Sequence, residues 1–183
     1  ICLFGIGGKN LNQIGLKSIF PMNSLSLMGI LEIIPKIPKL LSLINFTVKT
    51  IISIKPDIII TIDAPDFNFR IAKKLKKYNV DTKILHIVAP TVWAWKPKRA
   101  QKISKLIDYL FVLYPFEKKY FLPHGIKTFF IGHPIIEYSS KVRMNLKKTI
   151  EFNNNNKIIS IFPGSRKKEI IIHLNQILLS IEK

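Results

Sequence analysis

Residues Ile58–Phe69 read IIITIDAPDFNF, and the predicted fold is built outward from them. The first five are four isoleucines and one threonine, which is typical of a strand buried on both faces of a parallel sheet. Asp63 and Asp66 follow on the turn that leaves this strand, and Asn68 opens an amphipathic helix with lysines on its outer side. Because ligands bind where strands end and helices begin in open α/β sheets, we expect these carboxylates to mark a site of chemistry.

The same pattern of apolar strand, abrupt turn and helix recurs along the chain. Further strands are predicted at residues 1–6, 82–88, 109–113, 129–131 and 158–162. Helices are expected between them, including residues 40–54 and 98–106. This alternation predicts an α/β fold, in which a parallel, Rossmann-like sheet is covered by helices through right-handed connections.

Composition and charge narrow the choice of function only a little. The chain has 183 residues, 48% hydrophobic and 22% charged, as in ordinary globular proteins. Its formal charge of +18 favours an anionic partner such as nucleic acid, acidic lipid or a phosphorylated substrate. It equally fits a genome whose base composition favours Lys, Ile, Asn and Phe. Because the lysines are spread over helix faces, the charge does not by itself select nucleic acid.

The ends of the chain and an asparagine-rich run suggest the domain organisation. The sequence lacks an initiator Met, opens in an apparent strand and closes in an apparent helix, so we expect an internal piece of a longer protein. Residues 151–157, EFNNNNK, are predicted to form a linker because four consecutive asparagines form no packed element. Residues 1–150 are then most of a first domain, and residues 158–183 begin a second.

Residues 25–54 are apolar with scattered lysines at helical spacing. Pro35 and Pro38 predict a short helix, a break and a longer helix. The longer helix is interpreted as an ordinary cover for the sheet. For residues 25–38 two interpretations stay open: a similar cover, or a surface helix that inserts its apolar side into an acidic membrane. The residues predicted to contact lipid are Ile30, Ile33 and Ile34.

Two glycine-containing turns raise the question of phosphate binding. Gly5-Ile6-Gly7-Gly8 resembles half of a dinucleotide fingerprint but lacks its third glycine, so an ordinary turn is favoured. Gly164, Ser165 and Arg166 precede a predicted helix, whose N–H groups and positive dipole end suit a diphosphate. The alternative is that Ser165 merely caps that helix.

Other candidates follow the later strands. Trp93 and Trp95 in the segment VWAW either pack as a lid or plug on the core or line a pocket for a ring or an acyl chain, since two indoles are costly to leave in water. His133 could contact substrate or could be a turn residue. Glu117 could simply complement a helix dipole.

Taken together, the motifs closely resemble the lipid-A-disaccharide synthase family along nearly the whole chain. They are LMGI (27–30) with Glu32, KPD (55–57), IDAPDFN (62–68), VWAW (92–95), PFE (115–117), IGHP (131–134) and PGSR (163–166) with Glu169. The chain lacks the first strand and glycine-rich S-G-D turn of the family, and it stops before most of the C-terminal domain.

The resemblance implies an inverting glycosyltransferase of the GT-B type, with two Rossmann-like domains that hold the acceptor and the UDP-sugar. Such an enzyme joins UDP-2,3-diacylglucosamine to 2,3-diacylglucosamine 1-phosphate (lipid X), giving lipid A disaccharide 1-phosphate and UDP. No metal and no cofactor are implied. The location implied is cytoplasmic, peripheral on the inner leaflet of the inner membrane. The fragment alone is expected to be inactive, and its oligomeric state is not predicted.

Matching positions give the residue roles. Asp63 is the predicted general base, with Asp66 as the alternative unless it only caps the next helix. The predicted acceptor-binding residues are Asp66, Asn68, Trp93, Trp95 and His133. The predicted donor-phosphate residues are Gly164, Ser165 and Arg166.

Rival functions make different demands on the sequence. Another GT-B enzyme acting on UDP-N-acetylglucosamine, a transferase or an epimerase, would share the sheet and the Arg166 turn but not VWAW. A basic RNA-binding module would expose aromatic side chains on a sheet face, whereas here they sit mostly in apolar runs. A D-x-D phosphatase fails because its two acids are two residues apart. Asp63, Asp66, His86 and His133 lack recognised metal-ligand spacing.

Overall fold

The chain is described from a computed structural model, which places residues 2–25, 37–137, 139, 159–165 and 167–181. It divides into two compact units, Ile1–His133 and Pro134–Lys183. The predicted linker, residues 151–157, lies outside the described residues, so the predicted domain boundary stays a prediction.

The first unit contains a four-stranded parallel sheet, as the strand-turn-helix pattern predicts. Its strands are β3 (Ile58–Ile62), β4 (Lys83–Ile87), β5 (Tyr109–Val112) and β6 (Lys127–Phe130). They lie side by side in chain order, and all three pairs are parallel. The predicted α/β architecture with a parallel sheet is confirmed, and the carboxyl ends of the four strands share one edge.

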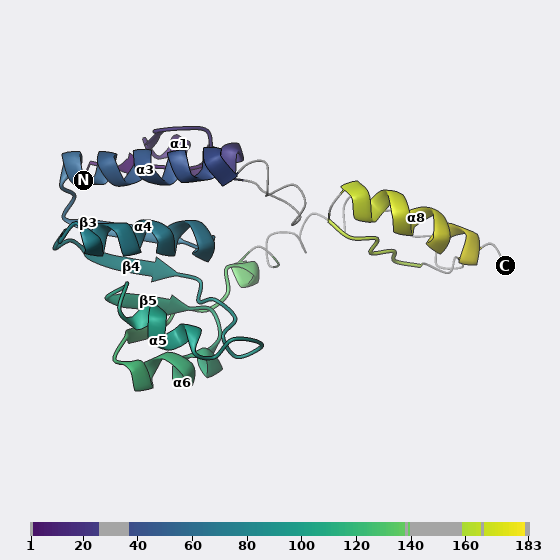
Figure 1. Cartoon of the computed structure of the whole chain (residues 1–183). Coiled ribbons are helices and arrows are strands. Elements are labelled where there is room, and N and C mark those ends of the chain that lie inside the picture. Colours follow the sequence, from purple (N-terminus) through teal and green to yellow (C-terminus); the bar gives the residue numbers. More distant parts are fainter. Residues whose placement is uncertain (1, 26–36, 138, 140–158, 166, 182–183) are drawn as a thin grey trace. The chain divides into compact units, whose positions relative to one another are not determined.

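Helices pack on one face of this sheet (Figure 1). They are α4 (Pro65–Lys77), α5 (Arg99–Ser104) and α6 (Lys118–Phe121), with short 3-10 turns at Pro115–Glu117 and Leu122–His124. The buried apolar side of α4 carries Phe67, Ile71 and Leu75, as the helical spacing predicts, while its lysines lie outside. These side chains share one core with Ile59, Ile84, Leu110 and Val112 of the strands and Phe121 of α6.

The opposite face of the sheet is open, which corrects the prediction that β3 is buried on both faces. Ile58, Ile60 and Ile62 are between 46% and 56% exposed. The reason is topological: every connection from β3 to β6 steps in the same direction, so right-handed crossovers place all their helices on one side. Phe111 and Phe129, which belong to apolar runs in the sequence, stack on this open face.

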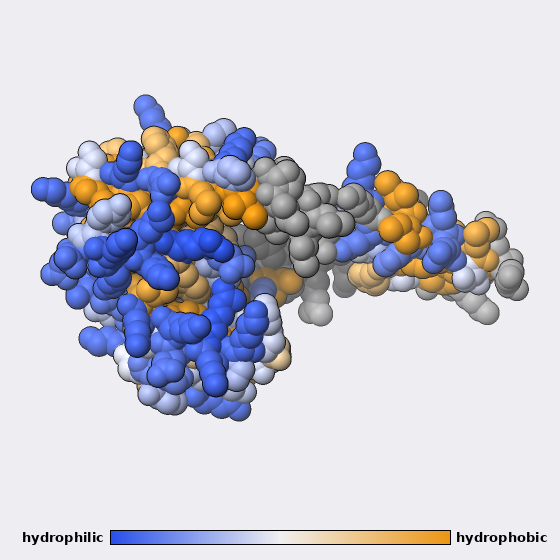
Figure 2. Space-filling view, in the orientation of Figure 1, coloured by the Kyte–Doolittle hydropathy of each residue, from blue (hydrophilic) through white to orange (hydrophobic). Residues whose placement is uncertain are grey.

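Helix α3 (Ile37–Ile54) runs beside α4 and adds Ile44 and Val48 to the core. It begins before the predicted residue 40, because Pro38 lies in its first turn, where proline is tolerated. By length and composition alone, α3 is the one described helix that could cross a membrane. That indication is weak, because a core helix of a soluble protein can have the same length and apolar composition. Apolar side chains do reach the surface over α3 (Figure 2). Leu41 and Phe46 are exposed there.

The remaining elements are short. A separate parallel pair of strands, β1 (Phe4–Gly5) and β2 (Lys17–Ser18), flanks α1 (Lys9–Gln13), and a 3-10 turn follows at Met22–Leu25. In the second unit, α8 (Lys167–Ile181) confirms the predicted helix. The predicted strand at 158–162 is absent from its described part, residues 159–162, because a strand needs a hydrogen-bonded neighbour and the described part of this unit offers none.

Candidate functional site

The Asp63 turn has an unusual backbone. Asp63 and Ala64 have φ angles of 49° and 42°, in the left-handed region that non-glycine residues rarely adopt. Each such residue costs about 1–3 kcal/mol, and strain of this kind clusters at functional sites. The Asp63 N–H donates to the Ile87 carbonyl at 2.9 Å, and Asn68 Nδ2 donates to the Asp63 carbonyl at 2.7 Å. The turn therefore presents the exposed Asp63 carboxylate from a fixed backbone at the end of β3.

Asn68 has a different task here from the one predicted. Its side-chain amide also lies 3.4 Å from the Ile62 carbonyl, so it ties the first turn of α4 back to the strand end. This contact holds the Asp63 backbone in place. Contact with an acceptor stays a prediction for this residue.

Asp66 is engaged with a cation that the sequence prediction missed. Its Oδ1 accepts from Arg99 Nη2 at 3.0 Å, although the Asp66 side chain is 88% exposed. The interpretation of Asp66 as a helix cap is wrong, because the N-cap of α4 is Ala64 and no side chain caps it. Arg99 opens α5, four residues after the last residue of VWAW, and this nearness to the motif was the signal in the sequence. With Asp66 paired, Asp63 is the freer carboxylate of the two.

His86 lies buried on β4, which pairs with β3, the strand directly before Asp63. It is 0% exposed, its Nδ1 lies 2.7 Å from Thr61 Oγ1, and its ring is 4.7 Å from that of Phe69. In the described part of the chain its Nε2 has no hydrogen-bond partner. Burial lowers the pKa of His86 to about 4, and the charge of Asp63 opposes part of that shift. His86 is therefore neutral at neutral pH.

Side chains after β4, β5 and β6 form a continuous line of rings, which we name the aromatic strip: Trp93, Phe116, Tyr114 and His133. Trp93 meets Phe116 edge to face at 5.4 Å, Phe116 stacks on Tyr114 at 5.7 Å, and Tyr114 lies 5.8 Å from His133. Two predicted residues, Trp93 and His133, are thus joined through two that were not predicted. Trp95 is outside the strip, with Lys96 Nζ 4.4 Å from its ring.

Neither tryptophan is a core plug. Trp93 is 44% and Trp95 is 55% exposed, while Val92 between strand and strip is 1% exposed and anchors the segment. Of the two alternatives for VWAW, a plug on the core is therefore wrong in this chain. A surface that lines a binding site is the interpretation that the geometry allows.

Glu117 fixes the Tyr114 side of the strip. It is 3% exposed, and its Oε2 accepts from the N–H groups of Leu113 and Tyr114 at 3.1 and 3.0 Å. A buried carboxylate that satisfies two backbone donors stabilises the turn on which Tyr114 and Phe116 stand. This is a more specific role than complementing a helix dipole.

In the second unit, Gly164 and Ser165 precede α8. Gly164 has a φ of 114°, and a Cβ there would lie 2.8 Å from the Cβ of Glu169. Both the conformation and the space therefore require glycine. Ser165 is exposed, and Arg166, like Ile30, Ile33 and Ile34, lies outside the described residues. The donor-phosphate and lipid-contact roles stay predictions.

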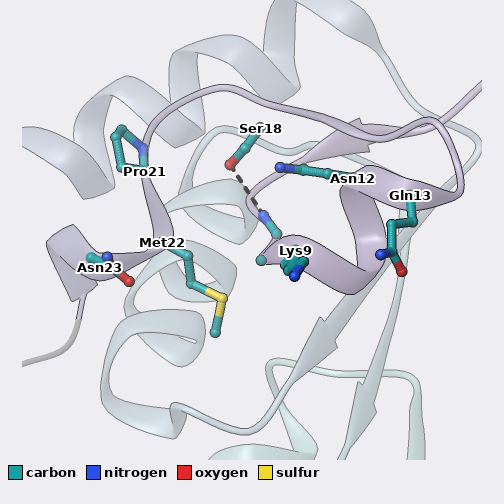
Figure 3. Close-up of a pocket in the computed structure, with 9 residues that line it drawn as sticks. Lys9, Asn12, Gln13, Ser18, Pro21, Met22 and Asn23 are labelled. Atoms are coloured by element: carbon teal, nitrogen blue, oxygen red, sulfur yellow. Dashed lines mark hydrogen bonds between the residues drawn. The ribbon is translucent and has the colours of Figure 1, made fainter.

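An open pocket of about 500 Å³ lies beside β1 and β2 (Figure 3). It is lined by Gly7, Gly8, Lys9, Asn12, Gln13, Ser18, Pro21, Met22 and Asn23. Ser18 Oγ accepts from the Gly7 N–H at 3.1 Å and donates to the Phe20 carbonyl, so it closes the glycine turn. The lining includes none of the predicted site residues. The turn interpretation of residues 5–8 fits this arrangement.

Metal binding finds no support in the described ranges, where no three His, Cys, Asp or Glu side chains are grouped as ligands. In particular, the nitrogen of His86 that faces Thr61 is already occupied. The expected independence from metals remains a prediction.

Comparison with known proteins identifies the family. The description "Lipid-A-disaccharide synthetase" belongs to the family that matches residues 1–183. The lipid-A-disaccharide synthase of Rickettsia bellii is 45% identical over 185 residues, which cover 99% of this chain and 48% of that protein. The Rickettsia conorii and Rickettsia prowazekii synthases are 45% and 44% identical, over 41% and 45% of their lengths. The chain thus spans about half the length of the curated relatives it matches. The resemblance carried by the sequence motifs is confirmed, and this chain belongs to the lipid-A-disaccharide synthetase family.

Proposed function

We propose that the protein containing this chain is a glycosyltransferase that joins UDP-2,3-diacylglucosamine to 2,3-diacylglucosamine 1-phosphate and releases UDP. Family membership supports the reaction class. The observation that carries the proposal is the exposed Asp63 carboxylate, held on a strained turn at the carboxyl edge of the sheet. Tryptophan and histidine side chains follow at the next strand ends of the same edge.

Asp63 is the general base in this proposal. An acceptor hydroxyl loses its proton to the carboxylate as its oxygen attacks the anomeric carbon, and the bond from that carbon to UDP breaks. The exposed position lets the carboxylate reach a bound sugar, and the Asn68 hydrogen bond to the Asp63 carbonyl holds the backbone that carries the carboxylate. Trp93, Trp95 and His133 contact the acceptor.

The leaving diphosphate needs N–H donors and positive charge. Gly164, Ser165 and Arg166 supply them in the proposed reaction. Gly164 has a φ of 114°, and a Cβ there would meet the Glu169 side chain, so this turn requires glycine. No metal ion takes part.

Disaccharide formation by the full-length protein tests the proposal. We expect labelled tetraacyl disaccharide phosphate and UDP in equal amounts from the two diacylglucosamine substrates, with EDTA present. No product from a folded full-length protein would overturn the proposal. Turnover of UDP-N-acetylglucosamine instead would assign the chain to the other kind of GT-B enzyme.

We also propose that the protein is cytoplasmic and peripheral on the inner leaflet, where its acylated substrates reside. The charge of +18 suits acidic headgroups, and Ile30, Ile33 and Ile34 would insert among the acyl chains. Flotation with vesicles containing anionic lipid should carry the wild type upward and leave the triple serine variant at the bottom. A variant that floats as well as the wild type would refute this lipid contact.

A further inference from the structure

The aromatic strip presents an apolar surface that the described protein leaves open. Trp93, Tyr114 and Phe116 are 44%, 45% and 43% exposed. Large aromatic side chains cost free energy when they face water, and contiguous exposed apolar surface marks a binding site. Because three ring contacts connect the strip, it is one surface rather than scattered residues.

The strip is also held in shape before any ligand binds. Val92 is buried on one side, and the buried Glu117 carboxylate fixes the backbone of Tyr114 on the other. The Phe116 ring lies between those of Trp93 and Tyr114 and contacts both. A preformed surface loses little conformational entropy on binding.

Its chemistry suits a hydrocarbon chain better than a sugar ring. A sugar needs several hydrogen-bonding groups around it, whereas the strip carries three polar side-chain groups, the Trp93 indole N–H, the Tyr114 hydroxyl and the His133 imidazole, on otherwise apolar rings. The strip instead extends across the ends of β4, β5 and β6. An extended acyl chain can follow such a line.

The order of the strands gives the ligand a direction. β3 neighbours β4, so the Asp63 turn lies at one end of the same edge and the strip follows the ends of the next strands. Asp63 and Asn68 are polar, and the rings after β4 to β6 are apolar. An amphipathic molecule laid along this edge therefore has its headgroup at Asp63 and its tail on the rings.

We propose that the aromatic strip binds an acyl chain of the acceptor, and that Tyr114 and Phe116 determine the preference for acylated over unacylated acceptors. The inference rests on the proposed function, because it takes the acceptor sugar at Asp63 as given. Nothing in the motif pattern assigns Tyr114 or Phe116 such a role.

The test compares acceptors with progressively shorter acyl chains in the full-length protein. For the wild type, KM should rise about fourfold for every two methylenes removed, the factor expected if half the surface of each is buried. In Phe116→Ser this dependence should fall below about twofold, while kcat at saturation changes little. Phe116→Leu keeps an apolar side chain and should retain most of the dependence.

Phe129→Ser is the matched control, because Phe129 is 46% exposed but lies on the open sheet face. It should keep the chain-length dependence of the wild type. If Phe116→Ser keeps that dependence as well, the strip does not bind the chain and the proposal is overturned.

A second readout does not need turnover. The fluorescence of Trp93 is the part of the signal that is lost in Trp93→Phe. An acceptor brominated near the end of its acyl chain should quench this fluorescence, and the quenching should be weaker in Phe116→Ser. Unquenched Trp93 at saturating acceptor would overturn the proposal. If the wild type forms no disaccharide with any acceptor, the proposed function is wrong. The quenching experiment then still shows whether the strip binds an acyl chain.

Discussion

Asp63→Asn should lower kcat for disaccharide formation by about 10²- to 10⁴-fold, the range that general base catalysis contributes. An asparagine amide cannot take a proton from the acceptor hydroxyl, yet it has nearly the shape of the carboxylate. The hydrogen bonds that hold this turn use the backbone of residue 63, so they survive the substitution. Steady-state kinetics of the full-length protein would show the loss in kcat with KM for the UDP-sugar little changed.

Asp66→Asn is the matched control, three residues away in the first turn of α4. It removes an exposed ion pair with Arg99, and such pairs contribute only about 0.2–1 kcal/mol. We therefore expect its kcat to stay within about fivefold of the wild type. If Asp66→Asn loses its activity while Asp63→Asn stays active, Asp66 is the general base. Two active variants would remove both carboxylates from the chemistry.

Local pattern was enough to predict the elements around this site. β3 and α4 follow from their apolar spacing, and the acids at their junction follow from the sequence itself. Pro65 indicates a break after the strand, but the left-handed φ angles of Asp63 and Ala64 have no signal in the sequence. The position of Asp63 at a strand end was therefore predictable, and its backbone conformation was not.

What covers each face of the sheet was not predictable from local pattern. Isoleucines suit both the buried and the open side of β3, and only the direction of successive crossovers decides which side receives helices. Local pattern also failed for residues 159–162, before α8. Their apolar run would form a strand only beside another strand that accepts and donates its hydrogen bonds.

The aromatic strip shows the same limit at the level of the site. Trp93, Phe116 and His133 are far apart in the sequence, and they meet because β4, β5 and β6 end at one edge in register. The pairing of Asp66 with Arg99 likewise depends on where α5 starts. Sequence motifs predicted several of these residues one by one but not their contacts.

Acid should destabilise the first unit through His86. The folded-state pKa of about 4 lies below the ordinary 6.5, so the unfolded chain binds the proton more tightly between those values. The contribution to stability is fully present above pH 6.5 and is lost as pH falls toward 4. At about 1.4 kcal/mol per pKa unit, the loss amounts to about 3 kcal/mol.

Urea denaturation at pH 7 and pH 4 measures this loss. His86→Gln removes the titrating ring and should shrink the difference in unfolding free energy between the two pH values by about 3 kcal/mol. An equal pH dependence in His86→Gln and wild type would contradict a buried, neutral His86.

The charge of Asp63 connects this behaviour to the proposed base. Burial lowers the pKa of His86 to about 4, while the Asp63 carboxylate and a hydrogen bond with the Val88 backbone raise it. Asp63→Asn removes the first of these opposing effects, and NMR titration of the imidazole should then show a pKa below that of the wild type. Asp66→Asn should not shift it. An unshifted His86 in Asp63→Asn would mean that the two side chains do not interact, whatever that variant does to turnover. The base assigned from kinetics and the charge that acts on His86 are thus tested independently with one substitution.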